Sequence, residues 1–260
     1  MSILDLLAEH ARERTKQAKT VKPTAEICRE ALMMPKDDFG FEKALSGGGP
    51  AFICECKKAS PSRGLIAEEF PYLEIAADYE AAGAEAISVL TEPKWFLGRD
   101  SYLREIAAAV SIPCLRKDFT VDEYMIYEAK VLGASAVLLI CAILEESRIR
   151  DYLAVCDGLG LSALVEAHDP AEIETALHAG ARIVGVNNRN LKDFSVDTEN
   201  SRLLRALVPK EVLFVSESGV RDAGDIRAAR EMGADAVLIG EALMRAGDRR
   251  AKLAELRGKP

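Results

Sequence analysis

The stretch GAEAISVL, residues 83–90, has a form that recurs three more times along the chain. In each copy an apolar segment leads into a Gly-Ala pair, and an apolar run begins within two residues of that pair. Glycine suits the left-handed position that ends a helix, and a small residue after it lets the chain turn tightly into a strand. The other copies are GASAVLLI at 133–140, GARIVGV at 180–186 and GADAVLIG at 233–240.

The spacing of these copies indicates a barrel. Their glycines are 50, 47 and 53 residues apart, which is the length of two strand–helix units. Four such modules predict eight units, and steady alternation of strand and helix implies parallel pairing with right-handed crossovers. Asp169 and Asp222 are predicted helix caps. Helices are predicted from apolar spacings of three and four residues at Glu74–Ala82, Val121–Leu132, Pro170–Ala179 and Ala223–Met232.

Residues 1–45 fall outside this repeat. Ile3, Leu4, Leu6 and Leu7 form one apolar stripe, and a second helix is predicted from Thr24 to about Met34. We therefore expect a single (β/α)8 barrel at 46–260 with an N-terminal helical extension, 1–45, packed on it as part of one domain. That extension is placed to help close the active face.

Composition narrows the class of protein. A net charge of −8 argues against nucleic acid and anionic membrane as partners. The longest uncharged apolar stretch, Ala136–Leu144, is too short to span a bilayer, and the N-terminus carries no apolar signal region. Six cysteines without a CxxC pair fit reduced thiols used as small hydrophobes. These features predict a cytoplasmic enzyme that is a monomer or a weak homo-oligomer.

The apolar runs that read as strands end in polar residues. A parallel strand buried on both faces is a continuous apolar run, and ligands bind at the carboxyl ends of barrel strands. Two residues apart on one strand, Glu55 and Lys57 should point into the same barrel mouth. Further polar residues at strand ends are Lys117, Glu166, Asn187 and Arg189.

These residue types suit acid–base chemistry. Lys117 is expected to be desolvated by its neighbours and so tuned as a proton donor near neutral pH. Glu166 is a candidate general base, and Arg189 could bind a planar carboxylate through two hydrogen bonds. His168 is expected to anchor its loop. A divalent metal held by Glu55, Glu166 and Glu217 is an alternative that the interleaved lysines disfavour.

Glycine-containing turns after the last two strands resemble the usual barrel phosphate site. There, backbone N–H groups and the start of a short helix hold the anion. Ser218 and Gly219 follow the seventh strand, and Gly240 and Glu241 follow the eighth. The Glu241 side chain is expected to turn to solvent while its backbone N–H contributes. We name these four residues the phosphate seat.

Seven linked segments lie between about residues 50 and 245: CECKKASPSRGLI, SVLTEPKWFLG, PCLRKDF, LVEAHD, GVNNRNL, SESGV and AVLIGEALM. Together they resemble the indole-3-glycerol-phosphate synthase family of tryptophan biosynthesis. They occur in the family's order, and the N-terminal helices resemble its extension more loosely. The resemblance implies a lyase that decarboxylates and dehydrates 1-(2-carboxyphenylamino)-1-deoxyribulose 5-phosphate, a phosphorylated anthranilate-derived substrate, without metal or organic cofactor.

The resemblance also implies roles. Lys117 corresponds to the proton donor to the ketone oxygen, and Glu166 to the base and acid of the dehydration. Lys57 corresponds to an anion-binding lysine that is a second candidate donor. Glu55 and Asn187 correspond to residues that orient the sugar hydroxyls and the lysines. Ser60 and Arg189 correspond to residues that contact the aromatic carboxylate. The remaining implied substrate contacts are Glu217 and the phosphate seat, with Phe96, Phe119, Leu138 and Leu191 around the aromatic ring.

Two other functions stay open at this level. A barrel such as phosphoribosylanthranilate isomerase would also handle a phosphorylated substrate, but it is expected to use a cysteine/aspartate pair. A non-catalytic barrel that binds a metabolite or a partner enzyme would be expected to lack part of the acid–base set.

Overall fold

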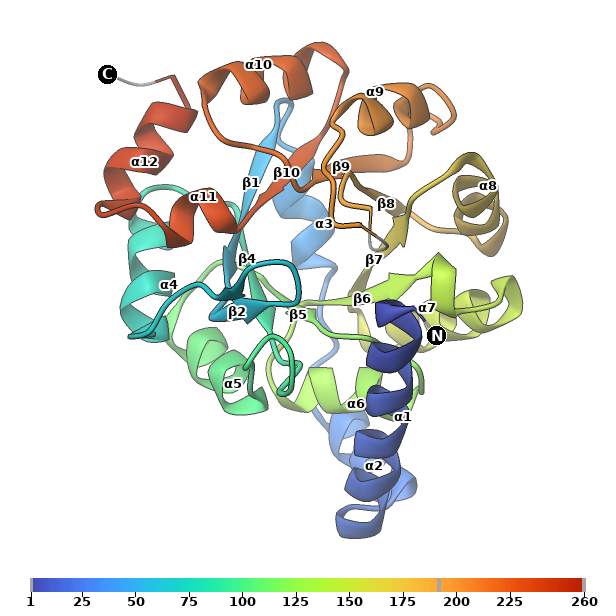
Figure 1. The fold of residues 1–260 in the computed structure, drawn as a ribbon. Coiled ribbons are helices and arrows are strands. Elements are labelled where there is room, and N and C mark those ends of the chain that lie inside the picture. The colour runs from blue at the N-terminus through green and yellow to red at the C-terminus, as the bar shows by residue number, and fades with distance from the viewer. Residues whose placement is uncertain (1, 191–192, 259–260) are drawn as a thin grey trace.

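Eight parallel strands close into a barrel in the computed structural model, which describes residues 2–190 and 193–258. The barrel lies at the centre of Figure 1 with helices around it. The expected (β/α)8 architecture is therefore confirmed. In barrel order the strands are β1 (Ala51–Cys56), β4 (Ala86–Leu90), β5 (Cys114–Lys117), β6 (Ala136–Ile140), β7 (Ser162–Ala167), β8 (Ile183–Asn187), β9 (Leu213–Glu217) and β10 (Ala236–Ile239), and β10 pairs with β1.

The helices that follow the strands form the outer ring. The four glycines of the repeat all have positive φ, as predicted for positions that end helices. Asp169 and Asp222 cap their helices as predicted. The helix predicted from Val121 begins at Tyr124, because the Asp122 carboxylate accepts the Tyr124 N–H and forms a turn first. The ring contains α4 (Tyr72–Ala81), α5 (Asp100–Ala109), α6 (Tyr124–Val131), α7 (Glu146–Leu159), α8 (Pro170–Ala179), α9 (Glu199–Arg205), α10 (Ala223–Glu231), α11 (Glu241–Met244) and α12 (Arg249–Leu256).

Short elements lie in the loops that follow the carboxyl ends of the strands. The antiparallel pair β2 (Ala59–Ser60) and β3 (Gly64–Leu65) forms a small hairpin in the loop after β1. A 3-10 turn, η1 (Cys141–Ile143), follows β6. Loops at this end of a barrel carry its ligand-binding groups.

The hydrophobic core has two layers. The first lies between the strands and the outer helices. It includes Cys54 and Cys56, which share the outward face of β1, and all six cysteines are unpaired. Inside the barrel, Ile53, Leu115 and Leu164 pack together as the second layer.

The N-terminal helices lie at both ends of the barrel. They are α1 (Ile3–Val21), α2 (Thr24–Met33) and α3 (Gly40–Leu45). At the amino-terminal end, Phe41 and Leu45 of α3 are buried against the inner layer, and the Glu42 N–H donates to the Ser162 hydroxyl at the start of β7. In contrast α1, dark blue in Figure 1, lies over the opposite end, while α2 packs on α6. The division at residue 45 stays a prediction.

Candidate active site

A cavity of about 660 Å³ opens at the carboxyl ends of the barrel strands. Its walls contain every predicted site residue that the structure describes, and Leu191 lies outside the described residues. Loops after separate strands thus meet at one site. The predicted residues that line it are Glu55, Lys57, Ser60, Phe96, Lys117, Phe119, Leu138, Glu166, Asn187, Arg189, Glu217, Ser218, Gly219, Gly240 and Glu241.

Lys117 lies at the centre of the charged groups. Its Nζ is 3.1 Å from Oε2 of Glu166 and 3.3 Å from Oε2 of Glu217. Both carboxylates are almost fully buried, and the lysine side chain is 13% exposed. The three residues come from β5, β7 and β9, so only barrel closure brings them together.

The electrostatics of this trio differ from the expectation for Lys117. Burial by itself would lower the pKa of Lys117, but the carboxylates of Glu166, Glu217 and Glu55 outweigh burial and raise it. The prediction of a donor tuned to neutral pH is therefore wrong for the substrate-free site. Lys117 stays an ammonium there, because three acids surround it.

The two acids beside Lys117 differ from each other. Burial raises the pKa of Glu217 to about 7, against the attraction of Lys117 and with added repulsion from Glu166 and Glu55. Burial also acts to raise the pKa of Glu166, yet Lys117, His168 and the Asn187 amide hold it below its ordinary value. Two neighbouring carboxyls with separated pKa values allow one to work as a base while the other keeps a proton.

Glu55 and Lys57 form a second ion pair at the mouth, as their spacing predicted. Lys57 Nζ donates to Oε1 of Glu55 at 2.5 Å. The pair passes directly over Gly240, where an added Cβ would lie 2.5 Å from Glu55 Oε1 and 2.9 Å from Lys57 Nζ. A side chain at 240 would therefore displace the pair.

The phosphate seat is built from two adjacent turns. Ser218 and Gly219 both have positive φ after β9, and Gly240 precedes the four-residue helix α11. Ser218 Oγ donates to Oδ1 of Asn187, which also accepts the N–H of Arg189. The turn after β9 is thereby tied to the end of β8.

The Glu241 side chain is not turned to solvent, contrary to expectation. It is 28% exposed, and its carboxylate lies 3.0 Å from Arg63, 3.3 Å from Arg245 and 3.7 Å from Arg189. These arginines come from the β2–β3 hairpin, the end of α11 and the loop after β8. Arg63 and Arg245 line the cavity but were not predicted as site residues. The spacing of four residues between Glu241 and Arg245 is visible in the sequence, whereas the contact of Arg63 with Glu241 depends on the fold.

Apolar residues form the other side of the cavity. Phe96 and Phe119 have ring centroids 6.1 Å apart and ring planes tilted by 42°, and Leu138 lies in the same inner cluster as Phe119. The loop that carries Phe96 is organised by Glu92, which is fully buried. Its carboxylate accepts the N–H groups of Lys94, Trp95 and Phe96, at 3.0, 2.7 and 3.0 Å.

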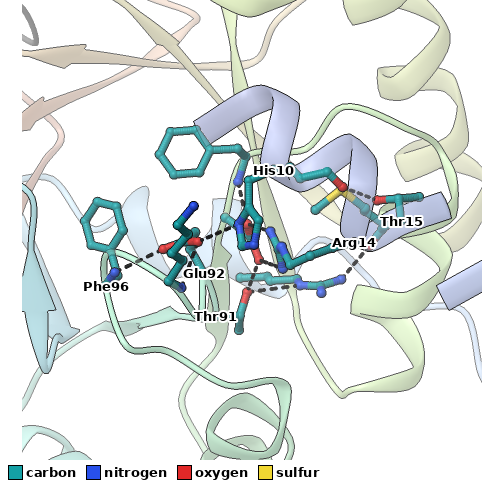
Figure 2. A network of polar contacts seen from close by, with 12 residues as sticks. His10, Arg14, Thr15, Thr91, Glu92 and Phe96 are labelled. Carbon is teal, nitrogen blue, oxygen red and sulfur yellow. Dashed lines mark hydrogen bonds and ion pairs between the residues drawn. The ribbon is translucent and has the colours of Figure 1, made fainter. Parts of the chain in front are cut away.

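The first helix, α1, is tied to the same loops (Figure 2). His10 Nδ1 lies 3.1 Å from Oε1 of Glu92, and Arg14 forms two hydrogen bonds with Asp118, the residue after Lys117. Ile3 and Leu7 of this helix line the cavity. Their apolar stripe is visible in the sequence, but its contact with the cavity is not, since that contact depends on how α1 crosses the barrel.

The arrangement of carboxylates and cysteines does not favour either the metal site or the cysteine/aspartate pair considered from the sequence. Each of Glu55, Glu166 and Glu217 lies against a lysine, and no cluster of three or more His, Cys, Asp or Glu within residues 2–190 and 193–258 is arranged to hold a metal ion. The six cysteines do not line this cavity, which disfavours the cysteine/aspartate alternative. Across the same part of the chain, no helix has the length and apolar character to cross a membrane.

The chain is similar to known proteins over nearly its whole length. The sequence model of the family described as indole-3-glycerol phosphate synthase matches residues 4–256. Two relatives of that description, from Ruminiclostridium cellulolyticum and Endomicrobium trichonymphae, are 58% and 53% identical. Each alignment covers 98% of this chain and 99% of the relative.

Solved structures with low sequence identity share the barrel. Thiamine phosphate pyrophosphorylase from Pyrococcus furiosus has a TM-score of 0.61 at 18% identity, covering 82% of this chain and 96% of that one. A 3-hexulose-6-phosphate synthase has a TM-score of 0.63 at 18% identity, covering 80% and 98%. At this identity the likeness concerns the fold alone.

Proposed function

The chain belongs to the indole-3-glycerol phosphate synthase family, and we propose that its barrel mouth carries out the family's ring closure with Lys117 and Glu166 as the reacting groups. It is an enzyme, a carboxy-lyase of tryptophan biosynthesis. The substrate in this proposal is 1-(2-carboxyphenylamino)-1-deoxyribulose 5-phosphate. The ion pairs of Lys117 with two carboxylates that line the cavity are the observation that carries the assignment.

Lys117 is proposed as the acid of the first step. The ring carbon that bears the carboxylate attacks the ketone carbon, and the ketone oxygen takes a proton from Lys117 Nζ as the bond forms. The carboxylate then leaves as CO2, and its electron pair restores the aromatic ring. Its raised pKa keeps Lys117 an ammonium at neutral pH, so that it has a proton to give and a positive charge that stabilises the oxyanion developing in front of it.

Glu166 is proposed as the base of the second step. The hydroxyl formed by ring closure leaves as water with a proton from an ammonium group of the site. Glu166 takes a proton from the neighbouring carbon, so that the new double bond completes the indole. Its lowered pKa keeps it ionised and able to accept that proton.

The rest of the cavity is proposed to hold the substrate in place. Phe96, Phe119 and Leu138 would enclose the aromatic ring, and Lys57, Ser60 and Arg189 would contact its carboxylate. The phosphate seat would bind the phosphate through backbone N–H groups. Anchoring both ends of a flexible sugar chain converts binding energy into orientation at the reacting carbons.

Finer properties follow from the proposed function and the composition. We expect a cytoplasmic enzyme that is a monomer or a weak homo-oligomer, with residues 1–45 and 46–260 folding as one domain. Reaction without metal or organic cofactor is likewise a prediction from the family resemblance.

Incubation of the purified chain with the substrate tests the proposal. We expect release of CO2 together with a product that has indole absorbance. Lys117→Met keeps the length of the side chain and should lower kcat by at least about 100-fold, the usual effect of losing a general acid. Lys43→Met, an exposed change on α3, is the control. No indole product from the wild-type chain, or equal kcat for Lys117→Met, would contradict the proposal.

A further inference from the structure

His168 lies at the outer side of the Glu166 carboxylate, opposite Lys117. It follows Glu166 by two residues and comes directly after β7, which ends at Ala167, and its ring approaches the Glu166 carboxylate. Its Nε2 is 3.5 Å from Oε1 of Glu166, whereas Lys117 contacts Oε2. The carboxylate therefore has a cationic or cation-forming group at each of its oxygens.

Glu172 of α8 holds the imidazole through the ring nitrogen that faces away from Glu166. Its Nδ1 lies 3.2 Å from Oε2 of Glu172, and the same oxygen accepts the His168 N–H at 2.7 Å. Glu172 itself is fixed in the first turn of α8, where the helix is capped by Asp169. On the next helix, α9, the Asn200 amide donates to the His168 carbonyl. These contacts leave the ring little freedom to turn away from Glu166.

The other ring nitrogen has an unusual environment. Nε2 of His168 is buried and has no hydrogen-bond partner among the described residues, and the Glu166 carboxylate lies 3.5 Å from it. A buried polar atom left in this state is costly unless a nearby charge compensates it. An anchor of the loop alone would need only Nδ1, since Nδ1 and the backbone make all the hydrogen bonds to the loop and helices.

We propose that His168 is a positioning residue that acts through Glu166: its imidazolium holds Oε1 of that carboxylate in place, keeps the carboxylate ionised and leaves Oε2 to Lys117. The inference rests on the proposed function, in which Glu166 is the base. It also revises the expectation from sequence that His168 only anchors its loop.

Charges around the ring support an imidazolium. Burial would lower the pKa of His168, but the hydrogen bond that its ring donates to Glu172 and the carboxylates of Glu166, Glu172 and Glu217 raise it to about 9. From η1, Cys141 lies near the same carboxylates, and burial raises the pKa of that thiol to about 12, which keeps it neutral. Lys117, on β5, is the cation on the far side of Glu166.

The pH dependence of kcat/KM tests the proposal. Removing a positive charge beside Glu166 raises the pKa of that acid. The acid limb of the kcat/KM profile, where Glu166 becomes protonated, should therefore move to higher pH by about one pH unit in His168→Gln. His168→Lys restores a cation and should move the limb back toward the wild-type position. His178→Gln, an exposed histidine on α8, is the matched control and should leave the profile unchanged.

A second measurement does not depend on turnover. The chain has three histidines, so the imidazole signals in an NMR titration are few and the one missing from His168→Gln is assigned directly. This signal should titrate at about pH 9, and Glu172→Gln should lower its midpoint. If the wild-type chain fails to turn over the substrate, the proposed function is wrong, while the titration still reports the charge on His168.

Two results would overturn the inference. One is an acid limb in His168→Gln that coincides with the wild-type limb, even if the melting temperature falls, because this would show a purely structural role. The other is a His168→Lys profile equal to that of His168→Gln, because a restored charge would then have no effect.

Discussion

Arg14 forms two hydrogen bonds with the carboxylate of Asp118, at 2.6 and 3.2 Å, although 104 residues separate them. Asp118 is fully buried and directly follows Lys117. Burial opposes its ionisation, but Arg14 and Arg116 hold the pKa of Asp118 below its usual range. The contact thus joins the N-terminal extension to the residue next to the proposed general acid.

Replacement of Arg14 should therefore affect both stability and activity. In Arg14→Met, Asp118 loses its bidentate partner in a buried position, which costs about 3 kcal/mol of unfolding free energy. With α1 loosened beside Lys117 and Phe96, kcat/KM should fall about tenfold. Arg12→Met removes an exposed ion pair with Glu9 on the same helix and is the control. Identical denaturation curves and rates for the two variants would show that the contact is dispensable.

Lys57 and Lys58 offer a matched pair of adjacent lysines. Lys57 lines the cavity and pairs with Glu55, whereas Lys58 is absent from the cavity lining. Lys57→Met should lower kcat/KM by about 100-fold, since it removes a cation from the substrate carboxylate and leaves the buried Glu55 without its paired lysine. Lys58→Met should retain activity close to wild type. Steady-state kinetics with both variants decide this, and equal losses would disprove the assignment.

Gly240 should be intolerant of a methyl group for a steric reason. In Gly240→Ala, the added carbon would lie 2.5 Å from Glu55 Oε1 and would push the Glu55–Lys57 pair aside. We expect kcat/KM to fall at least tenfold, because small displacements of reacting or binding groups are costly. Gly247→Ala is the control, since nothing lies within 4 Å of its added carbon. An active Gly240→Ala enzyme would mean that the pair can shift without loss.

Glu217 should make stability decrease as pH rises. The pKa of Glu217 is about 7 in the folded protein against an ordinary value of 4.5. Between these values the folded state holds a proton that the unfolded chain has released, so the unfolding free energy falls with increasing pH. Glu217→Gln mimics the neutral acid. The unfolding free energy of this variant, measured with guanidinium, should therefore fall less between pH 5 and pH 8 than that of the wild type. Exposed Glu174→Gln should follow the wild-type curve, and parallel curves for all three would contradict the raised pKa.

Much of the architecture could be predicted from local pattern. The recurring Gly-Ala pairs mark where helices end and strands begin, and such signals depend on a few adjacent residues. Polar residues after apolar runs marked Glu55, Lys117, Glu166 and Asn187 as groups of one barrel mouth, because all parallel strands point their carboxyl ends the same way. The motif resemblance added the roles and the ring-binding residues.

Other parts of the site depend on contacts between distant segments. Arg63, Arg189 and Arg245 neutralise Glu241. The i,i+4 spacing accounts for Arg245, but no sequence spacing places Arg63 and Arg189 beside this carboxylate. The α1 contacts with Asp118 and Glu92 depend likewise on the path of the helix across the barrel (Figure 2).

The sequence by itself determined the barrel and the identity of the groups at its mouth, because strand–helix periodicity and residue type are local properties. Only the tertiary structure decided how those groups behave. Lys117 was expected to lose its proton easily through burial, yet closure of the barrel surrounds it with Glu55, Glu166 and Glu217 and raises its pKa. Charge interactions act through space, so the sign of a pKa shift depends on neighbours that the order of residues does not reveal.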